Sequence, residues 1–231
     1  MKTGYRYEVK FVVDDIQLSE FYRWMWTALS VAEAYPGREI NSLYFDDINY
    51  QSARDNIIGL PYREKYRLRW YEQTNGPEAD GLKMEKKVRN GRVGYKVFRF
   101  LEHSKLDFLS HEVSRLSDLF HNDFESLGLM ESSLLPHLIP VLQIRYFRNY
   151  YMDENQIRIT VDDGIQFYPV ESADRLSGSI PVRNTKKIIE VKFSPELKSR
   201  VSALFRTLHL MPHRCSKYLT GLAMTGSLKY L

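Results

Sequence analysis

The residues best placed to do chemistry in this chain are basic side chains that recur at every second position of short segments. Lys65, Arg67 and Arg69 alternate with aromatic and aliphatic neighbours, and Lys83 and Lys87 do the same further along the chain. Arginine can bind phosphate through several donors at once, whereas lysine contributes a compact point charge. Basic residues in this pattern therefore favour the binding of a phosphate-rich polyanion.

The elements that must position these side chains are β-strands. Alternation with a period of two is typical of a strand, because successive side chains point to opposite faces of a sheet. A turn-rich stretch, TNGPEADG, separates the two basic segments, so residues 64–89 are predicted to form a β-hairpin. Further strands are predicted at residues 5–13, 41–46, 141–151, 156–163 and 187–193.

The sign of the charges separates these strands from an ordinary half-solvated sheet, whose outer face is also ionic. The ionic faces, together with Arg148, carry eleven basic and four acidic residues, although the net charge of the chain is only +4. Like charges about 6 Å apart repel by roughly 3 kcal/mol at an effective dielectric near 20, so we expect them to surround a polyanion. The basic residues are Arg6, Lys10, Lys65, Arg67, Arg69, Lys83, Lys87, Arg89, Arg148, Arg158 and Lys192, and the acidic ones are Glu8, Glu85, Asp162 and Glu190.

The apolar faces of the strands need cover, and amphipathic helices can supply it. Helices are predicted at residues 16–34, where a Pro-Gly pair ends the pattern, and at 195–210, with a helical insertion at about 98–136. Helices outside and cations inside predict an α+β fold: a closed or nearly closed antiparallel β tunnel or barrel with a basic polar lumen. We expect residues 1–231 to form a single domain.

Other kinds of site find little support in the sequence. It contains no glycine-rich phosphate loop, its histidines lack zinc-site spacing, and the single Cys215 excludes an internal disulfide. No stretch approaches the roughly 20 apolar residues that span a bilayer, and the N-terminus has no signal-peptide segment. These features predict a cytoplasmic protein without a membrane span.

Eight short motifs, taken in order, resemble a known family. The chain resembles the VTC domain, the polyphosphate polymerase domain of the vacuolar transporter chaperone complex and its bacterial stand-alone relatives, within the triphosphate tunnel metalloenzyme (CYTH-like) superfamily. Each motif is weak alone, but eight in this order are specific, and they extend over nearly the whole chain. The motifs are RYEVKF, SLYFDD, KYRLRWY, MEKKVR, YFRNYY, IRITVDD, IIEVKF and RCSKYLTG.

The resemblance implies roles for individual residues, with Mn²⁺ or Mg²⁺ as the metal. Glu190 corresponds to the family's metal-binding glutamate, and Glu8 and Glu85 are further metal candidates. Arg145 and Arg148 fall on opposite faces of a regular strand, so only a bulge would bring both inside. The implied phosphate-binding residues are Lys10, Arg67, Arg69, Lys87, Arg148, Arg158, Arg214 and Lys217, and additional tunnel candidates are Arg6, Lys83, Arg145 and Lys192.

One departure from the superfamily pattern bears on the reaction. The ExExK signature stands here as Arg6-Tyr7-Glu8-Val9-Lys10, with Arg6 in place of the first acid. By resemblance, this favours the polymerase branch over an ordinary triphosphatase or adenylate cyclase. It also leaves a metal with fewer carboxylates.

The expected activity is an ATP-dependent polyphosphate polymerase, which transfers the γ-phosphoryl group of ATP to a growing polyphosphate chain. The alternatives are a metal-dependent tripolyphosphatase and a non-catalytic module that binds polyphosphate or another polyanion. A closed tunnel admits only a slender chain, so we expect no DNA partner. The eukaryotic polymerase has a phosphate-sensing domain and membrane helices that are not in this sequence. Regulation and export are therefore expected to need other chains, such as a membrane-protein partner. The oligomeric state stays open.

Overall fold

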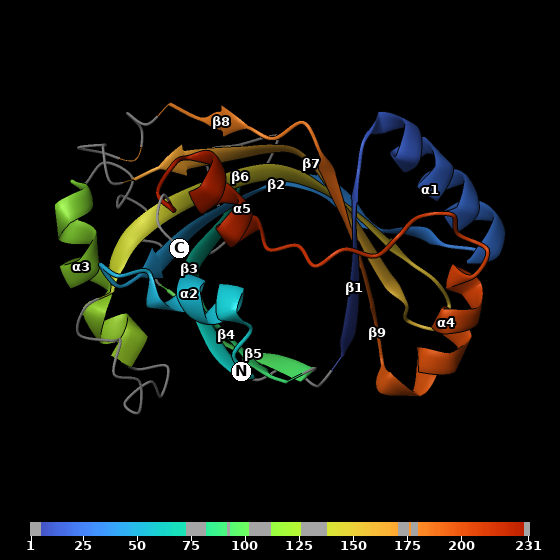
Figure 1. Cartoon of the computed structure of the whole chain (residues 1–231), viewed down its shortest axis with the longest axis horizontal. Helices are drawn as coiled ribbons and strands as arrows, with labels where there is room; N and C mark the ends of the chain where they lie inside the picture. Colours follow the sequence, from blue (N-terminus) through green and yellow to red (C-terminus); the bar gives the residue numbers. More distant parts are fainter. Residues whose placement is uncertain are drawn as a thin grey trace.

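The computed structural model describes residues 6–72, 82–91, 93–101, 112–125, 138–170, 176 and 180–228, and one antiparallel sheet forms its frame (Figure 1). None of the described helices is long and apolar enough to cross a membrane. The strands are β1 (Tyr7–Val13), β2 (Ala32–Asp46), β3 (Tyr62–Glu72), β4 (Lys83–Asn90), β5 (Val93–Phe100), β6 (Ile139–Met152), β7 (Arg158–Pro169), β8 (Val182–Arg183) and β9 (Lys187–Phe193). The helices are α1 (Asp15–Ala28), α2 (Gln51–Ile58), α3 (Val113–Glu125), α4 (Lys198–Phe205) and α5 (Lys217–Met224).

The sheet runs in the order β1-β9-β7-β6-β2-β3-β4-β5, with β8 beside β7. It curves so strongly that β1 stands across from the end formed by β3, β4 and β5 (Figure 1). The edge strands β1 and β5 do not pair over the described residues, so backbone hydrogen bonds do not close the sheet. An ion pair of 3.6 Å between Glu8 of β1 and Lys87 of β4 bridges the gap instead. The predicted α+β class is confirmed, whereas a closed barrel is not.

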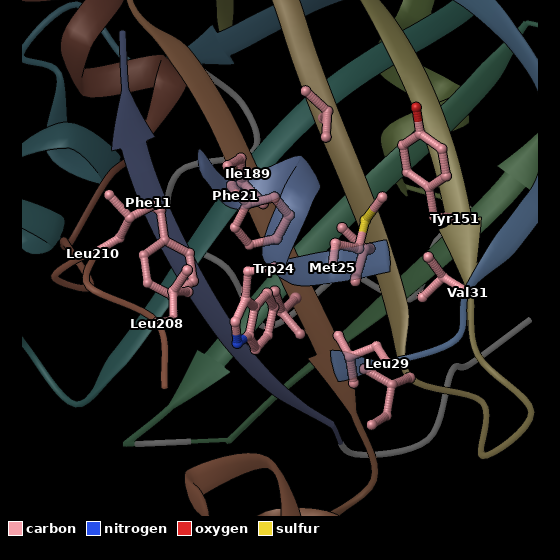
Figure 2. Packing of buried hydrophobic residues seen from close by; sticks show 14 of the residues in the cluster. Phe11, Phe21, Trp24, Met25, Leu29, Val31, Tyr151, Ile189, Leu208 and Leu210 are labelled. Atoms are coloured by element: carbon pink, nitrogen blue, oxygen red, sulfur yellow. The ribbon is translucent and has the colours of Figure 1, made fainter. Parts of the chain in front are cut away.

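The outer face of the sheet is apolar and is covered by helices. Phe21 and Met25 of α1 meet Phe11 of β1 in a cluster that α4 completes (Figure 2). On the other half of the sheet, Phe124 of α3 packs against Phe45 of β2, with ring centroids 4.9 Å apart. Each fully buried side chain of this size contributes roughly 1.5–3 kcal/mol. The apolar sides of β1 and β9 on one half of the sheet, and of β2, β3 and β4 on the other, are therefore used for packing, which leaves their ionic sides facing inward.

The inner face is divided between an apolar end and an ionic remainder. At the apolar end, Tyr218 and Leu222 of α5 pack against Leu142 and Phe167 of the sheet. Gly221 makes this contact close, because a Cβ there would lie 2.5 Å from Leu142 and 2.6 Å from Phe167. A side chain at this position would push α5 away from the strands. Helix α5 therefore fills part of the inner face and brings its own N-terminus to the ionic part.

The predicted first helix is too long. Helix α1 ends at Ala28, and residues 32–46 form the long strand β2, so Pro36 and Gly37 lie inside a strand instead of ending a helix. The pairing register of β2 with β6 shifts between Tyr35 and Arg38. Such an irregularity accommodates a proline, because the local ladder hydrogen bonds are already interrupted.

Two further predictions need correction near residue 98 and at the C-terminus. Residues 93–100 form β5, which extends the 64–89 hairpin into three strands, so the first described helix of the predicted insertion is α3. The rest of the predicted insertion, residues 102–111 and 126–137, lies outside the described residues, as does the TNGPEADG turn. The helix predicted to reach residue 210 already ends at Phe205. Helix α5 was not predicted at all.

Candidate functional site

The curvature of the sheet gathers the ionic side chains into two clusters on the inner face. Residues paired across antiparallel strands point to the same side, so the register of Lys10 with Glu190, Arg148 with Asp162, and Arg67 with Glu85 builds one continuous surface. The Glu190 cluster consists of Glu8, Lys10, Lys87, Arg148, Asp162, Glu190, Lys192 and Lys217. The Glu85 cluster consists of Arg67, Arg69, Lys83, Glu85 and Lys96.

Glu190 is at the centre of the first cluster and is 7% exposed. The ammonium group of Lys10 lies 3.0 Å from Glu190 and 3.1 Å from Glu8, and that of Lys192 lies 2.5 Å from Glu190. Burial opposes ionisation of Glu190, but the surrounding charges, Lys10 first among them, outweigh it and hold the pKa well below its usual range. Glu190 is therefore a carboxylate at neutral pH.

Asp162 is the second buried acid of this cluster, with no exposed surface. Arg148 donates to its two oxygens through bonds of 2.5 and 2.7 Å, and the ammonium group of Lys217 contacts Oδ2, which also accepts from Arg148 Nη2. Burial raises the pKa of Asp162, and the charges of Arg148 and Lys217 lower it further than burial raises it. Lys217 is the first residue of α5, where the helix dipole disfavours a cation, so its position depends on this carboxylate.

The Glu85 cluster has one carboxylate for four cations. Glu85 is 1% exposed and receives bonds of 2.5 and 2.7 Å from Arg67, while Lys96 lies 3.1 Å away. Lys83 and Arg69 lie further off, at 3.7 and 3.9 Å. Burial, opposed in part by Glu85, lowers the pKa of Lys96 to about 8. The excess of positive charge indicates that this cluster can accept an anion from outside.

Neutral side chains hold the two arginines of this cluster in place. Arg67 donates to the Tyr44 hydroxyl at 3.0 Å. Arg69, which is 7% exposed, donates to Ser42 Oγ and to the Tyr146 hydroxyl, each at 3.2 Å. Because these bonds restrict the guanidinium groups before any ligand arrives, an anion binding here requires little rearrangement.

Some residues singled out in the sequence do not join either cluster. Arg158 lies opposite Lys192 in the register but is exposed, as is Arg6 nearby. Arg214 is exposed too, close to Arg63. Arg145 aligns with Asn41 and Trp70 on the outer face, where it pairs with Glu39; the register shift that follows Arg145 in β6 does not bring it inside.

Other residues of the inner face were not among the sequence candidates. Lys96 comes from β5, a strand that sequence analysis did not predict. The signal was present, because Lys96 stands between Tyr95 and Val97 in an alternating pattern. Asp162 and Lys65 were counted on ionic faces but were given no role. The signal for Lys65 was its place two residues before Arg67, which puts both on the same face of β3.

The carboxylates of the inner face provide a partial set of metal ligands. Over the described residues, no three His, Cys, Asp or Glu side chains form a group that could hold a metal ion. Glu8 and Glu190, however, both contact the ammonium group of Lys10, so they lie close enough to share one cation. Mg²⁺ is commonly held by one or two carboxylates and takes its other ligands from water and phosphate. The pair therefore fits a divalent ion that is bound together with phosphate.

Comparison with known proteins places this geometry in a family. A family model described as the VTC domain matches residues 5–225, whereas no curated protein matches the chain. A candidate adenylyl cyclase from Hippeastrum, in which triphosphatase activity is dominant, superposes with a TM-score of 0.56 at 11% identity, covering 96% of each chain. A protein from Pyrococcus horikoshii OT3 superposes with a TM-score of 0.52 at 14% identity, covering 96% of this chain and 99% of its own. At these identities the two structures support the fold alone. Since the family match extends over nearly the whole sequence, the chain belongs to the VTC domain family, as its ordered motifs indicated.

Proposed function

We propose that the protein is an ATP-dependent polyphosphate polymerase, in which the inner face of the curved sheet holds the triphosphate of ATP and the growing chain. The observation that carries this proposal is the Glu85 cluster, where four buried or half-buried cations share one carboxylate. Membership of the VTC domain family supports a function in polyphosphate or triphosphate chemistry. The place of Arg6 in the superfamily signature favours transfer over hydrolysis.

Arg67 and Arg69 are proposed to hold phosphate oxygens of the donor and to stabilise the charge that develops during phosphoryl transfer. Their hydrogen bonds to Tyr44, Ser42 and Tyr146 fix the direction of their donors. In phosphoryl transfer, catalysis consists mainly of positioning and electrostatic stabilisation. No side chain of the protein has to act as a nucleophile, because the terminal phosphate oxygen of the chain attacks the γ-phosphorus and ADP leaves.

Glu190, with Glu8, is proposed to hold the Mn²⁺ or Mg²⁺ ion. A divalent ion bound there would neutralise phosphate oxygens and bridge them to the protein. Lys10 and Lys192 contact the same carboxylates, so their ammonium groups lie where they can also reach phosphate. Arg148 and Lys217 are proposed to act beside them, held in position by Asp162.

The test is the product formed from ATP with Mn²⁺ or Mg²⁺, separated by chain length on a polyacrylamide gel. Wild-type protein should form polymer, and Glu190→Gln and Arg67→Met should each reduce the rate by about 100-fold or more. Arg115→Met, which removes an arginine whose side chain is 73% exposed on α3, is the matched control and should retain the wild-type rate.

Each alternative function predicts a different product. Orthophosphate without polymer would identify a tripolyphosphatase, in which water takes the place of the chain. Tight binding of polyphosphate without turnover in either metal would identify a binding module. Polymer formation that survives both Glu190→Gln and Arg67→Met would show that the reaction takes place elsewhere.

A further inference from the structure

Lys65 differs from the other lysines of the inner face. It is half-buried on β3, and its ammonium group donates to Ser216 Oγ at 2.8 Å. Over the described residues, no carboxylate lies within ion-pair distance of it. By contrast, Lys10 contacts two acids, Lys217 contacts two, and Lys96 contacts Glu85. Lys65 is therefore a half-buried lysine whose protonated form has no carboxylate partner among the described residues.

The surroundings of Lys65 make its charge more unfavourable still. Burial, followed by the charges of Lys87 and Lys10, holds the pKa of Lys65 well below its usual range. Arg67 repels it as well. The ring of Tyr218 lies 5.6 Å from the ammonium group, a contact that compensates only weakly for the lost solvation. Buried charges are normally paired, so an ammonium group that has no carboxylate partner beside a basic surface is suited to bind an anion.

Lys65 also lies at the junction of the two clusters. Among the cations that repel it, Lys10 belongs to the Glu190 cluster and Arg67 to the Glu85 cluster. The segment that precedes α5 passes between the facing ends of the sheet (Figure 1). This segment contacts both ends. The backbone N–H of His213 donates to the backbone oxygen of Lys10, and the backbone oxygen of Cys215 accepts from Lys10 Nζ at 3.2 Å. Ser216 Oγ accepts from Lys65 Nζ. Lys65 also pairs in register with Lys87 of the Glu190 cluster and precedes Arg67 by two residues on β3, so an anion that reaches from Lys87 to Arg67 passes close to Lys65.

We propose that Lys65 binds the phosphate of a linear chain that spans the two clusters, and so positions a substrate of three or more phosphates. This rests on the proposed function for its choice of ligand, but it concerns binding and requires no turnover. Lys65 is a substrate-positioning residue whose charge is left for the ligand to neutralise. Its removal should therefore change stability and affinity in opposite directions, which a structural lysine does not do.

The experiment compares Lys65→Met with wild type by calorimetric titration of tripolyphosphate without metal, and by thermal unfolding without ligand. Loss of one charge-assisted phosphate contact should weaken binding about 10- to 100-fold. The unfolding temperature should rise, because folding no longer has to desolvate an ammonium group among like charges. Lys186→Met is the matched control, since Lys186 is an exposed lysine paired with Asp14, and it should change neither quantity.

Lys65→Gln provides a second variant that removes the charge and keeps a donor for Ser216, so the comparison stands if the methionine variant does not fold. Unchanged affinity in whichever variant folds would overturn the proposal. So would a loss of affinity accompanied by a lower unfolding temperature, which indicates a structural role. If wild type binds tripolyphosphate but makes no polymer, only the proposed function fails. If wild type does not bind tripolyphosphate, both fail.

Discussion

The two ionic clusters of the inner face differ in how far the protein neutralises its own charges. The Glu190 cluster places three carboxylates among five cations, and its two most buried acids each contact at least two cations. The Glu85 cluster has a single carboxylate for four cations. Buried charges that pair with each other contribute to a fixed network, whereas surplus charges are free to bind a ligand. The first cluster thus combines structure with binding, and the second is mainly suited to binding.

The largest effect is expected when one partner of an ion pair is removed from the Glu190 cluster. Arg148→Met leaves the completely buried Asp162 without its bidentate partner, and unfolding free energy should fall by about 3–5 kcal/mol. Chemical denaturation measures this loss. The double variant Arg148→Met with Asp162→Asn removes both charges and should recover a large part of the stability. A loss below about 1 kcal/mol in the single variant would show that the network is not structural.

The corresponding change in the Glu85 cluster should strengthen the binding of an anion. Glu85→Gln removes the only acid among four cations, so tripolyphosphate affinity should rise by about tenfold, since the anion no longer competes with a carboxylate for Arg67. Stability without ligand should fall by about 1–3 kcal/mol, because cation repulsion is no longer offset. Calorimetric titration and denaturation measure the two effects. Lower affinity would mean that Glu85 serves mainly to orient Arg67.

The two clusters should also differ in how ligand binding depends on pH, because the pKa values of their lysines are shifted in opposite directions. Burial and the neighbouring Lys83 lower the pKa of Lys96 to about 8, with Glu85 opposing them, whereas contact with Asp162 and Glu190 outweighs burial and raises the pKa of Lys217. Lys96 therefore loses its charge above pH 8, while Lys217 keeps it. Lys96→Met should weaken tripolyphosphate binding about tenfold at pH 7 but only about twofold at pH 9. Taking the ratio to wild type at each pH cancels the titration of the ligand itself.

The same lowered pKa has a consequence for stability. The folded protein releases the Lys96 proton near pH 8, whereas the unfolded chain keeps it to about 10.4, so the unfolded state binds more protons between these values. Stability from this group should rise with pH across that window, and the rise should be smaller in Lys96→Met. The acids of the Glu190 cluster give a change of the same sign at low pH: their lowered pKa values predict that stability rises with pH there and is lost on acidification below about pH 4. Denaturation midpoints at a series of pH values measure both. For the binding experiment, tripolyphosphate affinity that changes by the same factor between pH 7 and pH 9 in wild type and in Lys96→Met would show that Lys96 does not lose its charge in this range.

Local alternation was enough to predict β1, β3, β4, β6, β7 and β9 and their ionic faces, but it predicted neither β5 nor which charges would meet. The hairpin of β3 and β4 was predicted because polar and apolar residues alternate in both of its runs, with Lys86 the one exception. Strand β2 was taken in part for helix, since AEA at residues 32–34 is a good helical sequence. Its strand state depends on pairing with both β3 and β6, which are distant in sequence. The isolation of Lys65 was equally beyond local pattern, because it depends on where the carboxylates of other strands lie.

Arg145 offers the smallest expected effect and the most direct contrast with Arg148, three residues away on the same strand. Arg145 lies on the outer face, where its side chain is 41% exposed and that of its partner Glu39 is 26% exposed. Ion pairs of this kind contribute about 0–1 kcal/mol, since water screens both charges. Arg145→Met should therefore lower stability by less than about 1 kcal/mol and leave tripolyphosphate affinity unchanged. A clear loss of affinity would mean that the bulge in β6 can rearrange to turn Arg145 inward, and the inner face would then extend beyond the two clusters.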